Sequence, residues 1–174
     1  LSGCESLKNV DGLAKLTQIT ALHFSECKSL QNVDGLAGLT QLTSLKWGWS
    51  HRGPVAHPDH TLTTRTEIAA YQDKVRIQMA LRDGDSLAEF KDITSLDLGG
   101  CDSLKNIDGL TILTQLTSLD LNGCDSLQNV DGLANCTQLT SLNLSSCDAL
   151  QNVDGLANCT QLTSLNLSSC DALQ

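Results

Sequence analysis

The fold is decided by a 23-residue unit that recurs through the second half of the chain. Residues 116–138 read LTSLDLNGCDSLQNVDGLANCTQ, and residues 139–161 read LTSLNLSSCDALQNVDGLANCTQ. Residues 128–150 recur without a change as residues 151–173. The same interval separates cysteines in both halves of the chain: Cys4 and Cys27, then Cys101, Cys124, Cys147 and Cys170. A fixed period of this length predicts a stack of structural repeats.

Within one repeat, the apolar residues are three positions apart except at one place, where they are two apart. They are Leu116, Leu119, Leu121, Cys124, Leu127, Val130, Leu133 and Cys136. The step of two, from Leu119 to Leu121, is typical of a β-strand and predicts that the residues beside and between them face away from the core. The steps of three bring the chain around a coil whose apolar side only a neighbouring coil can bury. We therefore predict a solenoid in which the strands form one parallel sheet.

This LxxLxLxxCxxL pattern resembles that of the leucine-rich repeat family and covers the chain except for about residues 48–84. The tail of each repeat, NVDGLAxLTQ, is most similar to bacterial internalin-type repeats, and the LSGCxSL phrase is also similar to plant disease-resistance repeats. Two departures from the internalin pattern are a cysteine where asparagine is usual and one extra residue before the next leucine. The resemblance implies an α/β solenoid, a right-handed coil with its parallel sheet on the concave face.

Two polar columns accompany the repeat. The aspartates of the first column each precede Gly-Leu, and the asparagines of the second stand two residues earlier: Asp11, Asp34, Asp108, Asp131 and Asp154, with Asn9, Asn32, Asn106, Asn129 and Asn152. We predict that the aspartate caps a short convex helical turn by accepting backbone N–H bonds, and that the asparagine satisfies backbone groups at the bend. A calcium-binding ladder is the alternative, but calcium-binding repeats place several carboxylates in each coil, and here there is one.

The eight cysteines are predicted to be free, buried thiols. Six of them hold an inward ladder position after the strand, whereas Cys136 and Cys159 stand where other repeats have leucine or phenylalanine. Neighbouring strands lie about 4.8 Å apart with parallel side chains. A disulfide needs converging Cβ atoms about 3.8 Å apart, and zinc needs four ligands around one point. Free thiols favour a reducing compartment such as the cytoplasm, although the sequence leaves the localisation open.

The repeat is interrupted at about residues 48–84, where we predict a loop over residues 48–62 and a helix over about residues 66–82. Thr64 or Thr66 is the expected N-cap, and Gly84 follows the end of the helix. The apolar residues of the predicted helix share one face: Ile68, Tyr71, Val75 and Met79. A strand is the alternative because apolar residues also alternate from Val75 to Leu81, but the alanines and glutamines favour a helix.

Composition excludes several classes of function. The chain has 174 residues with 20 Asp and Glu against 11 Lys and Arg, a net charge of −9, which argues against nucleic acid as a partner. No apolar run approaches the roughly 20 residues of a membrane span. No nucleophile elbow, phosphate loop or cofactor motif is present, so we expect neither an enzyme nor a cofactor. The histidines from His57 to His60 lack a recognisable ligand spacing, so a polar loop is favoured over a metal site.

Two functions fit this sequence: a protein-binding module and a structural spacer within a larger protein. In the binding hypothesis, the residue between the two strand leucines faces a partner on the concave side, and the insertion supplies the larger contacts. The candidate contact residues are His23, Lys46, Trp49, Arg52, His57, His60, Tyr71, Asp97 and Asp120. The spacer hypothesis predicts instead that the insertion packs away and leaves a uniform polar surface.

The two ends of the chain lack the polar caps with which solenoids normally cover their terminal coils. We therefore expect either a piece of a longer array or end-to-end association of copies. A monomer in dilute solution whose terminal coils are ordered and exposed would contradict this expectation.

Overall fold

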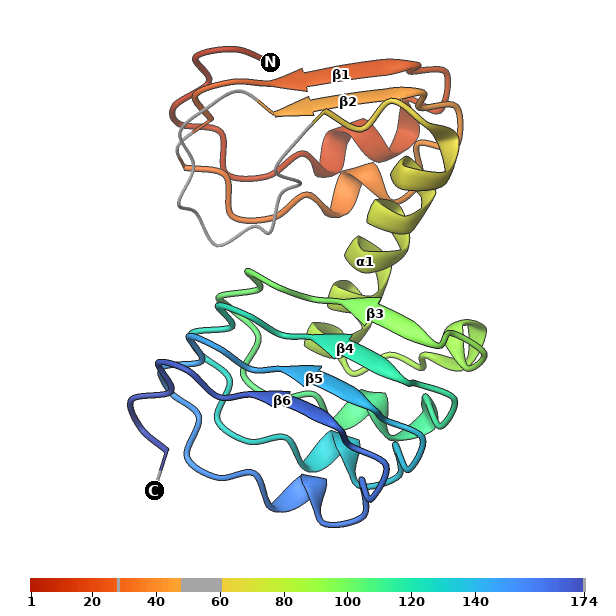
Figure 1. Cartoon of the computed structure of the whole chain (residues 1–174). Coiled ribbons are helices and arrows are strands. Elements are labelled where there is room, and N and C mark those ends of the chain that lie inside the picture. Colours follow the sequence, from red (N-terminus) through yellow and green to blue (C-terminus); the bar gives the residue numbers. More distant parts are fainter. Residues whose placement is uncertain (28, 48–60, 174) are drawn as a thin grey trace. The chain divides into compact units, whose positions relative to one another are not determined.

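The structure is a computed structural model that describes residues 1–27, 29–47 and 61–173 (Figure 1). The chain divides into two compact units, unit 1 at Leu1–Arg76 and unit 2 at Ile77–Gln174. In both, a short strand, a loop and a 3₁₀ turn follow one another around each coil. Among the described residues, no helix combines the length and the apolar character that a membrane span needs.

Unit 1 contains the strands β1 (Ala21–Phe24) and β2 (Ser44–Trp47), which pair in parallel with His23 opposite Lys46. Its two 3₁₀ turns cover Asp11–Lys15 and Asp34–Leu36. The free edge of β2 is taken by Leu62, which pairs antiparallel with Leu45 through N–H to carbonyl bonds of 2.9 and 2.8 Å. This pairing ends the parallel ladder of unit 1 at β2.

Unit 2 holds a four-stranded parallel sheet in the order β3-β4-β5-β6. The strands are β3 (Ser95–Asp97), β4 (Ser118–Asp120), β5 (Ser141–Asn143) and β6 (Ser164–Asn166). Its 3₁₀ turns are Ala88–Phe90, Asp108–Ile112, Asp131–Leu133 and Asp154–Leu156. The predicted parallel pairing at the 23-residue register is confirmed, and the strands form two sheets because the insertion separates β2 from β3.

Helix α1 (Arg65–Asp83) lies where the sequence predicts a helix, so the alternative of a strand is wrong. It begins with a capping box, in which the Glu67 N–H donates to Thr64 Oγ1 at 3.2 Å and the Thr64 N–H donates to Glu67 Oε2 at 3.0 Å. The chain leaves the helix at Gly84, whose φ of 76° suits glycine. Of the residues predicted to share the apolar face, Ile68, Tyr71 and Val75 are buried and Met79 is half-buried.

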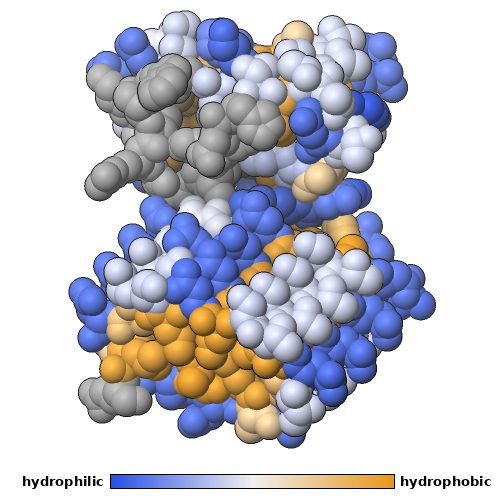
Figure 2. Space-filling view, in the orientation of Figure 1, coloured by the Kyte–Doolittle hydropathy of each residue, from blue (hydrophilic) through white to orange (hydrophobic). Residues whose placement is uncertain are grey.

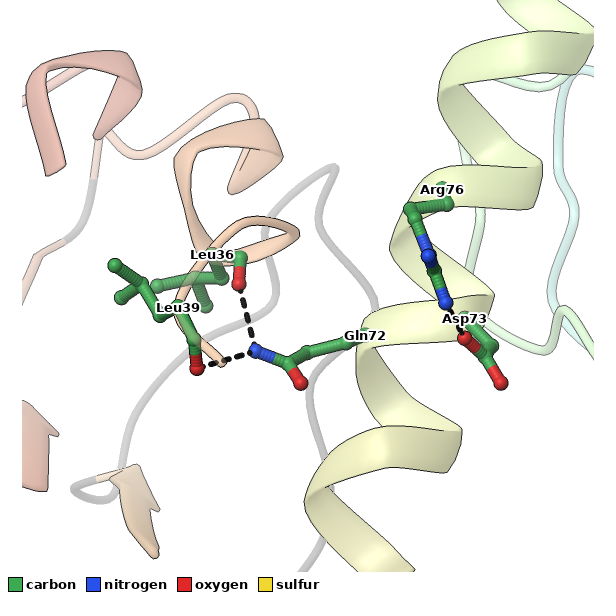
Figure 3. A network of polar contacts seen from close by, with 5 residues as sticks. All are labelled: Leu36, Leu39, Gln72, Asp73 and Arg76. Atoms are coloured by element: carbon green, nitrogen blue, oxygen red, sulfur yellow. Dashed lines mark hydrogen bonds and ion pairs between the residues drawn. The ribbon is translucent and has the colours of Figure 1, made fainter. Parts of the chain in front are cut away.

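The first part of α1 closes the last coil of unit 1. The buried Gln72 side chain donates from Nε2 to the Leu36 and Leu39 carbonyls at 2.9 and 3.0 Å (Figure 3). Arg65 donates to the Leu42 carbonyl at 3.0 Å. The helix thereby supplies additional hydrogen-bond donors to backbone carbonyls of this coil, which a purely apolar helix face could not do.

The last part of α1 belongs to unit 2 and buries a different side of the helix. Ile77 is buried although it lies nine residues after Ile68, which places it on the opposite side of an α-helix. Gln78 hydrogen-bonds Cys101, and the Leu81 side chain lies over Gly109. The single apolar face predicted from the sequence therefore describes only the part of the helix in unit 1.

In three of the five Asp-Gly-Leu turns, the glycine is the point at which one coil touches the coil before it. A Cβ atom built at Gly35, Gly132 or Gly155 would lie 1.9–2.1 Å from the carbonyl oxygen of the valine or isoleucine 25 residues earlier. Such a distance is far inside van der Waals contact. Gly12, which has no coil before it among the described residues, has no atom within 4 Å of that position.

The prediction that the aspartate column caps the convex turns is wrong. Each aspartate is the first residue of its 3₁₀ turn, and the N-cap is the preceding valine or isoleucine, which makes no side-chain capping bond. The asparagine two residues earlier accepts a bond from the N–H of each aspartate at 3.1–3.4 Å. The prediction for the asparagine column, that it satisfies backbone groups at the bend, is confirmed.

All eight cysteines are free, and all are buried except Cys4 and Cys170, which are half-buried. The ladder thiols of Cys124, Cys147 and Cys170 donate to the carbonyl of the strand-end leucine one coil earlier, at 3.3, 3.2 and 3.0 Å. Burial raises the pKa of Cys136 and of Cys147 to about 11. The prediction of free, mostly buried structural thiols is therefore confirmed. The thiols of Cys124, Cys147 and Cys170 also help to bind their coils to the previous ones.

Candidate functional site

The residue between the two strand leucines faces outward on each strand of unit 2. Leu96 and Leu98 are buried, whereas Asp97 between them is exposed. The equivalent residues stand directly opposite one another in the sheet register: Asp97, Asp120, Asn143 and Asn166. The strands therefore position a row of four carboxylate and amide side chains, which we call the central row.

Members of the central row are held by one another and by the backbone. Asn143 Nδ2 donates to both carboxylate oxygens of Asp120 at 3.2 and 3.3 Å. The Asn122 N–H donates to Asp120 Oδ1 at 2.8 Å, and the Gly99 N–H donates to Asp97 Oδ1 at the same distance. These bonds fix the side chains before any partner arrives, which lowers the entropy cost of binding.

A second polar row lies just past the end of each strand, two residues after the central row, at Gly99, Asn122, Ser145 and Ser168. Asn122 Nδ2 donates to the carbonyl and hydroxyl oxygens of Ser145 at 3.1 and 2.8 Å. The Ser145 and Ser168 hydroxyls donate to the central-row residues Asn143 and Asn166 at 2.7 and 2.6 Å. The two rows thus form one hydrogen-bonded polar surface of short side chains.

An acidic row follows the ladder cysteines, with one aspartate in each coil of unit 2: Asp102, Asp125, Asp148 and Asp171. Burial raises the pKa of Asp102, and the charge of Asp125 raises it further. The described residues contain no group of three or more histidine, cysteine or acidic residues that could hold a metal ion. The sequence interpretation missed this row, although reading the position after each cysteine at the 23-residue period would have found it.

The acidic residues of the chain are concentrated in unit 2. Unit 2 carries 13 Asp and Glu residues against three Lys and Arg, a net charge of −10. Unit 1 carries seven Asp and Glu residues against eight Lys and Arg residues, a net charge of +1. The net charges of the two units together give the −9 of the whole chain. Unit 2 therefore carries a strong excess of negative charge.

In unit 1, the exposed candidates are His23 and Lys46, which stand opposite each other on β1 and β2. Trp47 stacks on Phe24 with ring centroids 4.6 Å apart and meets Tyr71 edge to face at 6.4 Å. Tyr71 is only 7% exposed, so its ring packs in unit 1 and offers little surface to a partner. The candidates Trp49, Arg52, His57 and His60 lie outside the described residues.

A match to a protein-family model identifies the type of repeat that forms the coils. A family model described as the BspA type leucine-rich repeat region matches residues 1–45 and 86–174 in six copies. The chain belongs to this family. The match leaves out residues 46–85, which contain the predicted insertion, and it confirms that the chain is made of leucine-rich repeats. No curated protein matches the chain.

Two solved structures similar to these leucine-rich repeats are internalins of Listeria monocytogenes. The internalin InlF of strain 4b F2365 is 21% identical, with a TM-score of 0.45 over 96% of this chain and 39% of that one. The functional domain of InlJ, described as including a cysteine ladder, is 24% identical, with a TM-score of 0.40 over 97% of this chain and 34% of that one. The chain thus spans between one third and two fifths of their length.

Proposed function

We propose that this leucine-rich repeat chain is a protein-binding module that uses the concave face of its strands together with the insertion at residues 48–84. The central row of unit 2 is the observation that carries the proposal. Its four side chains stand in register, face outward and are already ordered by hydrogen bonds. The partner that suits such a row has lysine or arginine side chains, because Asp97 and Asp120 accept charge-assisted hydrogen bonds.

The candidate residues of unit 1 form a second proposed contact surface. His23 and Lys46 are exposed and adjacent on β1 and β2, so they suit carbonyl or carboxylate groups of a partner. Trp49, Arg52, His57 and His60 stay predicted contacts of the insertion. Tyr71 is left out of the proposed contacts because it is buried.

A structural spacer is the second candidate function. The observation that favours it is that the polar side chains of unit 2 satisfy one another, as they do between Asp120 and Asn143. A surface that needs no partner to satisfy its hydrogen bonds also suits a passive connecting element. The two candidates differ in whether the concave carboxylates bind a cationic partner.

The test compares two variants with the same change in charge on different faces. Asp97→Asn/Asp120→Asn removes both carboxylates of the central row and places there the residue that Asn143 and Asn166 already represent in the next coils. Asp108→Asn/Asp131→Asn removes two convex carboxylates from the same two coils. The probe is a decalysine peptide, titrated by calorimetry at about 0.15 M salt.

We expect the concave variant to weaken peptide binding about tenfold more than the convex variant, because only the concave carboxylates contact the peptide. Equal weakening by both variants would mean that the affinity for the peptide depends only on the total charge of the chain, and this result would overturn the proposal. Absence of binding to the unchanged chain would favour the structural spacer.

A further inference from the structure

One asparagine of the polar surface of unit 2 is followed by a glycine. Asn122 and Gly123 form the single Asn-Gly pair of the sequence, whereas the equivalent pairs are Gly-Gly at residues 99–100 and Ser-Ser at residues 145–146 and 168–169. Glycine has no Cβ atom, so its backbone nitrogen meets little hindrance when it approaches the preceding side chain. This pair is therefore chemically suited to deamidation, the conversion of the asparagine amide to a carboxyl group.

Deamidation of this pair has two steps. In the first, the Gly123 backbone nitrogen bonds to Asn122 Cγ and the bond from Cγ to Nδ2 breaks, so that Nδ2 leaves as ammonia with the Gly123 proton and a cyclic imide remains. In the second, water adds to one of the imide carbonyl carbons and opens the ring, which gives aspartate or isoaspartate. Water is the only reactant that the chain does not supply, and nothing is oxidised or reduced.

In the folded chain, one residue of the following coil holds both reacting groups. The Gly123 N–H donates to the Ser145 carbonyl oxygen at 2.8 Å. Asn122 Nδ2 donates to the same carbonyl oxygen at 3.1 Å and to Ser145 Oγ at 2.8 Å. We call these three hydrogen bonds the Ser145 contact. While they are formed, the attacking nitrogen keeps its proton and the departing nitrogen is held in place.

Water has access to this part of unit 2. The Asn122 side chain is exposed and Gly123 is half-buried. Figure 2 shows pale, weakly hydrophilic surface over the area where Figure 1 draws β4 and β5. The Ser145 contact, and not the exclusion of water, is therefore what opposes the reaction in the folded chain.

The product of the reaction does not restore the Ser145 contact. A carboxylate in place of the Asn122 amide has no N–H to donate to the Ser145 carbonyl oxygen. It also adds a negative charge beside Asp120, whose Oδ1 accepts the Asn122 N–H at 2.8 Å. Isoaspartate lengthens the main chain by one atom in a coil whose neighbours pair with it at the 23-residue register. Deamidation therefore weakens the packing of the two coils.

We propose that Asn122 is a deamidation site and that the opening of the contact between coils 116–138 and 139–161 controls the rate of its reaction. Folded proteins open locally, at a lower free energy than unfolding of the whole chain requires. Each opening breaks the Ser145 contact and frees the Gly123 nitrogen to attack. The reaction requires no partner, so it is independent of the proposed protein-binding function.

The first experiment tests the site in the unfolded chain. The unchanged chain and Gly123→Ser are incubated in urea at mildly alkaline pH, and peptide mapping by mass spectrometry follows the conversion of Asn122. Gly123→Ser is the matched control, because the next two coils already hold serine at this position with a similar positive φ, 58° at Ser146 and 59° at Ser169 against 67° at Gly123.

We expect Asn122 to react about tenfold or more faster in the unchanged chain than in Gly123→Ser, because the serine side chain hinders the attacking nitrogen. Equal rates in the two unfolded chains would overturn the assignment of this site.

The second experiment tests the control of the rate in the folded chain. Leu142→Ala loosens coil 139–161, where Leu142 is 1% exposed, and Leu45→Ala is the matched control, because Leu45 is fully buried in unit 1. Ser145→Ala is a milder variant that removes the hydroxyl acceptor of Asn122 Nδ2 and leaves the core unchanged. Circular dichroism checks that each variant keeps its fold.

We expect the folded, unchanged chain to react about tenfold or more slowly than the same chain in urea. Leu142→Ala should raise the folded rate about tenfold, as the loss of a buried leucine favours opening, Ser145→Ala should raise it by less, and Leu45→Ala should leave it unchanged. Equal rates in the folded and unfolded chains would show that the Ser145 contact does not protect Asn122. Equal acceleration by Leu142→Ala and Leu45→Ala would mean that unfolding of the whole chain controls the rate, and either result would overturn the proposal.

Discussion

The glycine of the Asp-Gly-Leu turn is the residue on which the distance between coils depends most directly. Its hydrogen atom faces the carbonyl of the preceding coil, where any Cβ atom would collide. We predict that Gly132→Ala lowers the free energy of unfolding by about 2 kcal/mol or more, because the coil must shift or the backbone must distort. Urea unfolding followed by circular dichroism measures the change.

Gly12→Ala is the matched control, since Gly12 holds the same position in the first coil and has no atom within 4 Å. It should change the free energy of unfolding by less than about 1 kcal/mol, and in the stabilising direction, because alanine restricts the unfolded chain. If both variants lose the same stability, the cost lies in the conformation of the turn itself and not in coil packing.

Single residues also show what the sequence could and could not predict. The free thiols followed from the 23-residue spacing, because residues in register on parallel strands do not converge into a disulfide. The predicted capping role of the aspartates was wrong. Each Asn-x-Asp segment offers two side chains that could accept a backbone N–H bond, and it is the asparagine that accepts one. Sequence cannot tell the N-cap from the first residue of a turn when both are compatible with the same pattern.

At the scale of elements, helix α1 packs on the last coil of unit 1 and hydrogen-bonds to it, as a further coil would. Gln72 adds a second, side-chain donor to the Leu36 and Leu39 carbonyls, each of which also accepts one backbone N–H bond. We predict that Gln72→Leu, which keeps the side-chain volume and the helix propensity, lowers the free energy of unfolding of unit 1 by about 1–3 kcal/mol. Fluorescence of Trp47, which packs in unit 1 against Phe24, reports the transition.

Arg76→Ala serves as the control for this prediction. Arg76 lies one helical turn after Gln72, is 44% exposed and forms an ion pair with Asp73 at the surface (Figure 3). Its loss should cost less than about 1 kcal/mol, as is usual for exposed pairs. A Gln72→Leu variant as stable as the unchanged chain would show that the backbone N–H donors of Leu39 and Leu42 are sufficient for these carbonyls and that α1 covers the coil only by apolar contact.

The helix illustrates the limit of periodicity as a predictor. Its existence and bounds followed from composition and from the capping signals around Thr64 and Gly84. The change of buried side between Val75 and Ile77 could not be predicted, because one apolar stripe and two offset stripes give similar spacings over five turns. Gln72 could not be predicted either, since a buried amide depends on carbonyls 33 and 36 residues away.

For the whole molecule, the dominant feature is the separation of charge between a unit 2 of −10 and a unit 1 of +1. In unit 2, the acidic row places one aspartate in each successive coil, and neighbouring strands of a sheet are typically about 4.8 Å apart. Two unit charges at that separation repel by about 1 kcal/mol in water. The composition predicted an acidic chain, but the division of the charge appears only when the boundary between the units is known.

We predict that salt stabilises unit 2 more than unit 1, because screening relieves the repulsion between like charges. Urea unfolding is followed at sodium chloride concentrations from about 0.01 to 0.5 M, a range over which the screening length falls several-fold. Circular dichroism reports both units, whereas tryptophan fluorescence reports unit 1, since both tryptophans lie there. The urea midpoint measured by circular dichroism should rise with salt concentration, and the midpoint measured by fluorescence should change less.

The double variant Asp125→Asn/Asp148→Asn should have a higher urea midpoint at low salt, and this midpoint should rise less as the salt concentration increases. A midpoint that falls with salt would mean that pairing between opposite charges, and not repulsion within the acidic row, governs the stability of unit 2.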